Sequence, residues 1–216
     1  MILKNLKKRI ITSTFLLFLV YLIFTFNIFL VFILILLAVL SILEFLQLIK
    51  KVFKNKFYNY LSSFIFIIYI FIFCIMFFFF SNFLQLKILL FSLLLGCVAS
   101  DIGGFIVGNI LKGPKLTKIS PKKTISGAVG SVIFTVIVIS GFFYYFTNSF
   151  SYKILIIAIA TSCSCQIGDL IFSFLKRKAK LKDTGNFLPG HGGILDRVDG
   201  ILLGVPIGFL ALNIFY

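Results

Sequence analysis

The chain has 216 residues, of which 61% are hydrophobic and 12% are charged, against roughly 25% charged in a usual soluble domain. With a mean hydropathy of +1.16, so much apolar surface cannot be buried in one small core, which excludes a soluble globular protein. The net charge of +15 would suggest nucleic acid binding in a soluble protein, but the basic residues here lie between apolar segments, so no nucleic-acid partner is expected.

Seven apolar segments come close to, or exceed, the roughly 20 residues that cross a bilayer. In chain order they are residues 10–26, 28–49, 60–80, 88–111, 125–146, 154–175 and 200–216. The first two are separated only around Asn27, but residues 10–49 are too many for one span, so a tight hairpin is expected. The basic start resembles a signal peptide but lacks a small-residue cleavage site, which favours a retained first helix. The chain is therefore predicted to be an all-α polytopic membrane protein with about seven transmembrane helices, forming a single integral membrane domain over residues 1–216.

The basic residues lie in alternate connections. All but two of the 21 Lys and Arg fall in the amino-terminal tail or after the second, fourth and sixth predicted helices; the exceptions are Lys87 and Lys153. Short cytoplasmic loops carry an excess of Lys and Arg. The pattern predicts a cytoplasmic amino terminus and a carboxyl terminus on the outside.

The scarce acidic residues are concentrated near the end of the chain. Asp196 and Asp199 are three residues apart at the start of the last predicted helix, a spacing that puts both carboxylates on one face. The two carboxylates could share one cation, and Asp169, near the end of the preceding predicted helix, could approach that cation from a neighbouring helix. Mg²⁺ prefers carboxylate oxygens, waters and substrate phosphates, which makes these three aspartates candidate metal ligands. The alternative is that they form structural ion pairs with Arg177 or Arg197.

Two further features carry polar chemistry. Asp101 lies inside the fourth predicted helix, where an ionisable group is costly unless it faces a polar cavity, although the glycines around it also serve helix packing. Residues 118–127 combine lysines, hydroxyls and the start of a helix, which together bind anions. The same lysines would also satisfy the positive-inside rule or attract anionic lipid. Glu44, which has no acidic neighbour in the sequence, is expected to be mainly structural.

A dense pattern of polar residues and glycines covers residues 173–199 and ends in Leu-Pro-Gly-His-Gly-Gly-Ile-Leu-Asp-Arg-Val-Asp. In this pattern the chain resembles the phosphatidate cytidylyltransferases, the CDP-diacylglycerol synthases. Three upstream segments agree in order and spacing: Asp101 with its glycines, Ser-Pro-Lys-Lys-Thr at 120–124, and Gly-Asp-Leu at 168–170. Residues 96–216 thus form a predicted catalytic half, whereas residues 1–95 match by hydropathy alone.

Two departures accompany the resemblance. The family commonly has Glu-Gly where this chain has Ser126 and Gly127, so any role of that carboxylate is missing or supplied elsewhere. Many members are also longer, with additional amino-terminal helices.

The resemblance implies a nucleotidyltransferase of phospholipid biosynthesis in the bacterial inner membrane, with its active site on the cytoplasmic side of the bundle. The phosphate of phosphatidate would attack the α-phosphorus of CTP, forming CDP-diacylglycerol and releasing pyrophosphate. The implied catalytic residues are Asp169, Asp196, Asp199, Lys176 and Arg177, of which the three aspartates would bind the metal. The implied substrate-binding residues are Asp101, Ser120, Lys122, Lys123, Thr124, Ser173, Lys182, Asp183, His191 and Arg197. His191 would either bind a phosphate or shape the turn before the last helix.

The implied cofactor is Mg²⁺, and a second monovalent or divalent cation is left open. The implied partners are CTP, phosphatidate and membrane lipid, and a homodimer is left open. Two other functions are compatible with part of the pattern. A cation transporter would use intramembrane aspartates, but its polar residues should line a path through the whole bilayer. A polyprenol-type kinase or an ether-lipid cytidylyltransferase would share the basic loop and the aspartates.

Overall fold

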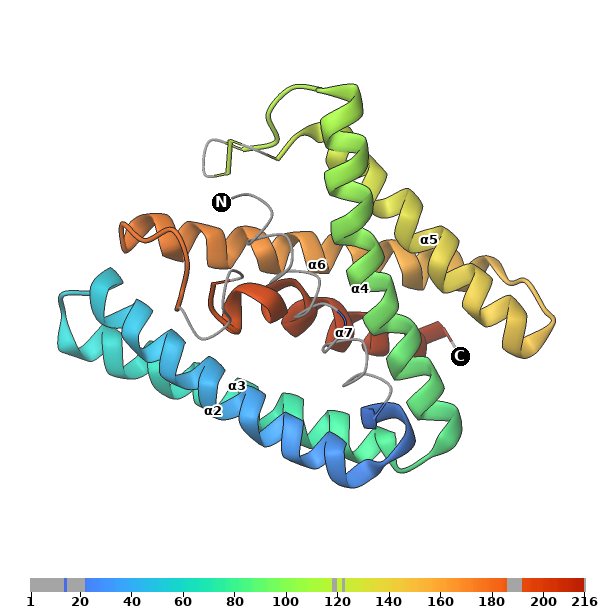
Figure 1. The fold of residues 1–216 in the computed structure, drawn as a ribbon, viewed down its shortest axis with the longest axis horizontal. Coiled ribbons are helices and arrows are strands. Elements are labelled where there is room, and N and C mark those ends of the chain that lie inside the picture. Colours follow the sequence, from blue (N-terminus) through green and yellow to red (C-terminus); the bar gives the residue numbers. More distant parts are fainter. Residues whose placement is uncertain (1–13, 15–21, 118–119, 122, 186–191, 216) are drawn as a thin grey trace. The chain divides into compact units, whose positions relative to one another are not determined.

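The structure is a computed structural model that describes residues 14, 22–117, 120–121, 123–185 and 192–215. The described residues form six long helices and one isolated β-bridge, between Lys115 and Thr124. The helices are α2 (Asn27–Val52), α3 (Lys56–Ser81), α4 (Leu84–Leu111), α5 (Ile125–Thr147), α6 (Tyr152–Lys178) and α7 (Leu195–Phe215) (Figure 1).

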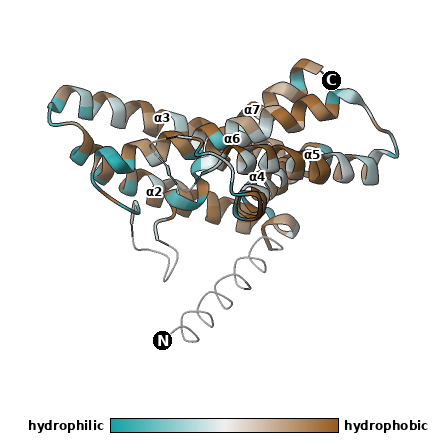
Figure 2. Cartoon of the chain, turned by 90° about the horizontal axis from the view of Figure 1, so that it is seen from above, coloured by the Kyte–Doolittle hydropathy of each residue, from teal (hydrophilic) through white to brown (hydrophobic). Residues whose placement is uncertain are grey.

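All six helices are long and apolar enough to cross a membrane. Figure 2 shows hydrophobic residues predominating along the helices and hydrophilic residues gathering in the connections. The all-α polytopic class is thereby confirmed, together with the last six of the seven predicted segments. The first predicted helix, residues 10–26, falls largely outside the described residues, and so does its hairpin with the second.

Several helices begin earlier than the apolar segments predict, because a helix starts where its first N–H groups find acceptors rather than where hydropathy rises. At α3 the side chain of Asn55 accepts a hydrogen bond of 2.9 Å from Phe57 N, so the helix begins at Lys56 instead of residue 60. Likewise, α7 begins at Leu195 instead of residue 200. The candidate residues Asp196 and Asp199 therefore lie within the first turns of α7, at the start of the last helix as predicted.

The chain divides into two compact units, which we describe separately. The first unit contains α2, α3 and residues 178–197; the second contains α4, α5, α6 and residues 198–215 of α7. In the first unit α2 and α3 form an antiparallel pair (Figure 1), in which the rings of Phe45 and Phe66 stack with centroids 3.8 Å apart. The single integral membrane domain over the whole chain stays a prediction.

In the second unit, glycines bring the backbones of neighbouring helices together. A Cβ atom added to Gly127 of α5 would lie 2.8 Å from Gly104 O of α4, and one added to Gly103 would lie 2.7 Å from Gly130 O. The glycines around Asp101 therefore serve close packing of α4 against α5, which is a common use of small residues in membrane helices. Asp101 itself lines a cavity that is described below.

Close packing of α6 against α7 depends on Gly168, because a Cβ atom there would lie 2.6 Å from the backbone oxygen of Asp199. We expect Gly168→Ala to lower the free energy of unfolding by about 1–3 kcal/mol, since a backbone atom cannot rotate away as a side chain can. Thermal unfolding of the purified protein in detergent measures the effect. Gly141→Ala on α5 is the matched control, because among the described residues no atom outside the helix's own backbone lies within 4 Å of the added Cβ there. Equal stability of the two variants would contradict the packing argument.

Candidate active site

The connection between α4 and α5 is a basic loop folded back on itself. Ile125 N donates to Pro114 O at 2.9 Å, and Leu116 N donates to Lys123 O at 2.8 Å. Thr124 then caps α5, because its hydroxyl accepts a hydrogen bond of 3.1 Å from Gly127 N. These contacts place Lys123 at the amino-terminal end of α5, where the helix dipole also favours an anion.

Lys123 forms an ion pair with Asp169 of α6, joining two predicted site residues that are 46 positions apart in the sequence. The two side chains are 27% and 29% exposed, so the pair is accessible to a ligand. Ser173, one turn further along α6, is within 3.5 Å of the other Asp169 oxygen. Asp169 is therefore held between a cation from the basic loop and a hydroxyl from its own helix.

A cavity of about 340 Å³ lies next to this ion pair, between α4, the basic loop, α5 and α6. Five predicted site residues line it: Asp101, Ser120, Lys123, Thr124 and Asp169. Asp101 is exposed rather than buried among neighbouring helices, and it lines this cavity from α4. The cavity, which brings together three separate sequence segments, is the candidate active site.

Gln166 also lines the cavity and is absent from the sequence-based predictions. Its amide nitrogen donates to Ala128 O at 3.2 Å and to the hydroxyl of Ser162 at 3.3 Å, so it joins α6 to α5 one turn before Asp169. The signal available in the sequence is a polar amide inside an otherwise apolar predicted helix.

A second ion pair in the second unit joins α6 to α7. Lys176 Nζ lies 3.7 Å from Asp199 Oδ2, and both side chains are 12% exposed. The other Asp199 oxygen accepts a hydrogen bond of 2.9 Å from Gly200 N. Both predicted catalytic aspartates of this unit, Asp169 and Asp199, thus carry a lysine partner. The side chains of Arg177 and Arg197 are exposed.

In the first unit, Asp196 closes the loop that precedes α7. Its Oδ2 accepts backbone hydrogen bonds from Thr184 N at 2.8 Å and from Gly193 N at 3.1 Å. Asp196 therefore ties both sides of this loop to the first turn of α7. Lys182 and Asp183 are exposed at the start of the same loop.

Two predicted site residues, Lys122 and His191, lie outside the described residues. Within either unit, the described residues contain no group of three His, Cys, Asp or Glu side chains that could hold a metal ion on its own. The three-aspartate metal site therefore stays a prediction. Mg²⁺ commonly takes only one or two carboxylates and fills its other positions with waters and substrate phosphates, so the donor set of aspartates fits such an ion.

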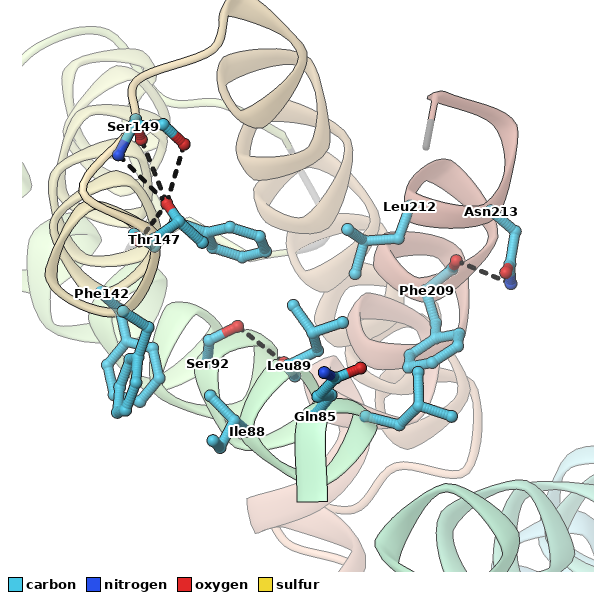
Figure 3. Close-up of a pocket in the computed structure, with 13 residues that line it drawn as sticks. Gln85, Ile88, Leu89, Ser92, Phe142, Thr147, Ser149, Phe209, Leu212 and Asn213 are labelled. Atoms are coloured by element: carbon cyan, nitrogen blue, oxygen red, sulfur yellow. Dashed lines mark hydrogen bonds between the residues drawn. The ribbon is translucent and has the colours of Figure 1, made fainter. Parts of the chain in front are cut away.

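A larger cavity of about 540 Å³ lies in the second unit at the start of α4 and the ends of α5 and α7 (Figure 3). None of the described residues that line it is charged. Several polar groups in it bond locally: Ser92 donates to Leu89 O and Asn213 donates to Phe209 O. This cavity offers apolar surface and no cation for phosphate, so it does not suit a nucleotide.

Comparison with known proteins identifies a family and several relatives. The model of the family described as the cytidylyltransferase family matches residues 3–215. A protein of Rickettsia bellii named phosphatidate cytidylyltransferase is 41% identical over 125 residues, which are 53% of this chain and 53% of that protein. Proteins with the same name from Helicobacter pylori and Bacillus subtilis are 40% and 39% identical, over 57% and 54% of this chain and 46% and 44% of their own length. The chain thus aligns with about half the length of these relatives.

Proposed function

The chain belongs to the cytidylyltransferase family, and we propose that it is a phosphatidate cytidylyltransferase, an enzyme that makes CDP-diacylglycerol from CTP and phosphatidate in a bacterial inner membrane. The observation that carries the proposal is the cavity in which Lys123 and Asp169 pair, because it joins the Ser-Pro-Lys-Lys-Thr segment to the Gly-Asp-Leu segment. The relatives named phosphatidate cytidylyltransferase support the choice of substrates.

In the proposed reaction a phosphate oxygen of phosphatidate attacks the α-phosphorus of CTP. The new P–O bond forms as the bond between the α-phosphorus and its bridging oxygen to the β-phosphorus breaks, and pyrophosphate leaves with that oxygen. The attacking phosphate is already ionised, so the reaction needs no strong general base. The main barrier is repulsion between two polyanions, which positioned cations lower.

Lys123 and Thr124 are suited to the triphosphate, since an ammonium, a hydroxyl and the start of α5 converge on one side of the cavity. Lys122 and Arg177 would extend this cationic surface, Ser120 would add a hydroxyl, and Lys176 would act beside Asp199. We assign phosphate binding to these residues, and we assign Asp101, Ser173, Lys182, Asp183, His191 and Arg197 to further contacts with the substrates.

We propose that Asp169, Asp196 and Asp199 bind Mg²⁺ when the nucleotide is present. When bound, the ion would offset negative charge on the triphosphate and on the leaving pyrophosphate. Asp169 would supply an anionic ligand for the ion, and Lys123, its ion-pair partner, would bind a phosphate oxygen.

The direct test is an assay of the purified protein in detergent with Mg²⁺, phosphatidate and CTP, in which the lipid product is identified by mass. Formation of CDP-diacylglycerol that depends on both substrates supports the proposal. A well-folded protein that converts neither substrate would overturn it.

The topology proposed for the enzyme places the basic loop in the cytoplasm, where CTP is available. We expect a cysteine introduced at Lys115 to react with a membrane-impermeant maleimide only from the cytoplasmic side of oriented vesicles. Ser149→Cys, in the connection between α5 and α6, is the matched control and should react only from the opposite side, since the two exposed positions lie at opposite ends of α5. Labelling of the Lys115 position from outside would contradict the topology and the proposed route for CTP.

A further inference from the structure

Glu44 of α2 is the most buried charged side chain among the described residues, with 1% of its surface exposed. Its carboxylate accepts three hydrogen bonds, all from the loop before α7 or from the start of that helix. The donors are Thr184 Oγ1 at 2.7 Å, Ile194 N at 2.9 Å and Leu195 N at 2.9 Å. All of these residues belong to the first unit.

These contacts make Glu44 the cap of α7, supplied from another helix. The first N–H groups of a helix have no partner within it, and the residue just before the helix usually provides the acceptor. Here that residue is Ile194, whose side chain has no acceptor. The Glu44 carboxylate takes its place and adds negative charge at the positive end of the helix dipole.

The loop is built to approach Glu44 closely. A Cβ atom on Gly185 would lie 2.6 Å from Glu44 Oε1, so a larger residue there would push the loop away. Thr184 is held twice, because its hydroxyl donates to Glu44 and its backbone N–H donates to Asp196. Two carboxylates, one from α2 and one from α7, therefore fix the two ends of the loop together.

We propose that Glu44 is a positioning residue for cytidylyl transfer, which holds Asp196 and the first turn of α7 in the geometry that the reaction requires. The inference rests on the proposed function, since Asp196 is assigned there to the metal. This role differs from that of an ordinary core residue, because Glu44 binds the loop before α7 and the start of that helix.

Glu44→Gln tests the proposal, because glutamine keeps the shape but has one acceptor oxygen in place of two. Removing a charged acceptor from buried N–H groups should speed hydrogen exchange of the Ile194 and Leu195 amides by about tenfold or more. We expect kcat to fall by a similar factor, and the Mg²⁺ concentration for half-maximal rate to rise. Ser41→Ala is the matched control on α2, since the Ser41 hydroxyl is buried and has no hydrogen-bond partner among the described residues.

Hydrogen exchange measured by mass spectrometry on the 216-residue protein in detergent distinguishes the possible outcomes. Faster exchange confined to residues 184–196, with α2 and α3 unchanged and kcat lowered, supports a positioning role. Unchanged exchange and turnover, or faster exchange throughout α2 and α3, would overturn it. Glu44→Asp keeps the charge and should restore part of both readouts. If the wild-type protein made no CDP-diacylglycerol, the proposed function would fail, and the exchange data would still decide whether Glu44 caps α7.

Discussion

Replacing Asp169 by Asn is expected to lower kcat by on the order of 100-fold or more, while the protein remains folded. Asparagine has the same shape but no charge, so it can neither balance Lys123 nor act as an anionic metal ligand. Asp199→Asn should have a comparable effect, because it leaves the largely buried Lys176 without its carboxylate partner. Initial rates over a range of Mg²⁺ concentrations, with gel filtration to establish folding, provide the measurement.

Exchanging the charges of Lys123 and Asp169 distinguishes a catalytic role of this ion pair from a purely structural one. A variant that carries both Lys123→Asp and Asp169→Lys keeps opposite charges at the same two positions. If the pair only stabilised the fold, the exchange would restore activity; if Asp169 binds the metal, the double variant stays inactive. Wild-type turnover by Asp169→Asn at low Mg²⁺ would show that the ligand assignment is wrong.

Lys123→Ala is expected to raise the apparent KM for CTP by about tenfold or more and to lower kcat as well. A triphosphate carries more charge than the single phosphate of phosphatidate, and a contact that tightens as pyrophosphate leaves acts on the transition state. Saturation curves for each substrate at a fixed concentration of the other measure both effects. Lys115→Ala is the matched control, because Lys115 is an exposed lysine of the same loop and is not among the described residues that line the cavity.

The saturation curves also separate the competing roles of the loop. A defect confined to the phosphatidate curve would assign Lys123 to the lipid headgroup. Equal kinetics for Lys123→Ala and Lys115→Ala would indicate that the lysines of this loop only orient the protein in the membrane.

The course of the chain through the six described helices could be predicted from hydropathy alone, because the cost of exposing polar backbone in lipid imposes long apolar helices. Their ends could not, since these depend on capping groups that hydropathy ignores. Asn55 and Thr124 cap helices from nearby in the sequence and are in principle recognisable. The cap of α7 is not, because Glu44 and Leu195 are 151 positions apart.

Part of the candidate site could also be predicted from the sequence, and part of it could not. The sequence places Asp196 and Asp199 at the start of the last helix, and the structure confirms that location. Their predicted place on one face of that helix stays a prediction. Spacing does not reveal the partners of these side chains. Only tertiary packing brings Lys123 to Asp169, and only the returning loop brings Thr184 N to Asp196. Gln166 was missed because a single amide in an apolar helix does not show which neighbouring helix it contacts.

The central claim is that this chain transfers the cytidylyl group of CTP to phosphatidate, and the fate of two radioactive labels tests it most directly. Parallel reactions of the purified protein with Mg²⁺ and phosphatidate would contain CTP labelled at either the α- or the γ-phosphorus. We predict that the α-label enters the lipid fraction as CDP-diacylglycerol, while the γ-label appears only in pyrophosphate. Transfer of the γ-label to lipid would identify a CTP-dependent kinase and contradict the account, as would the absence of any transfer by folded protein.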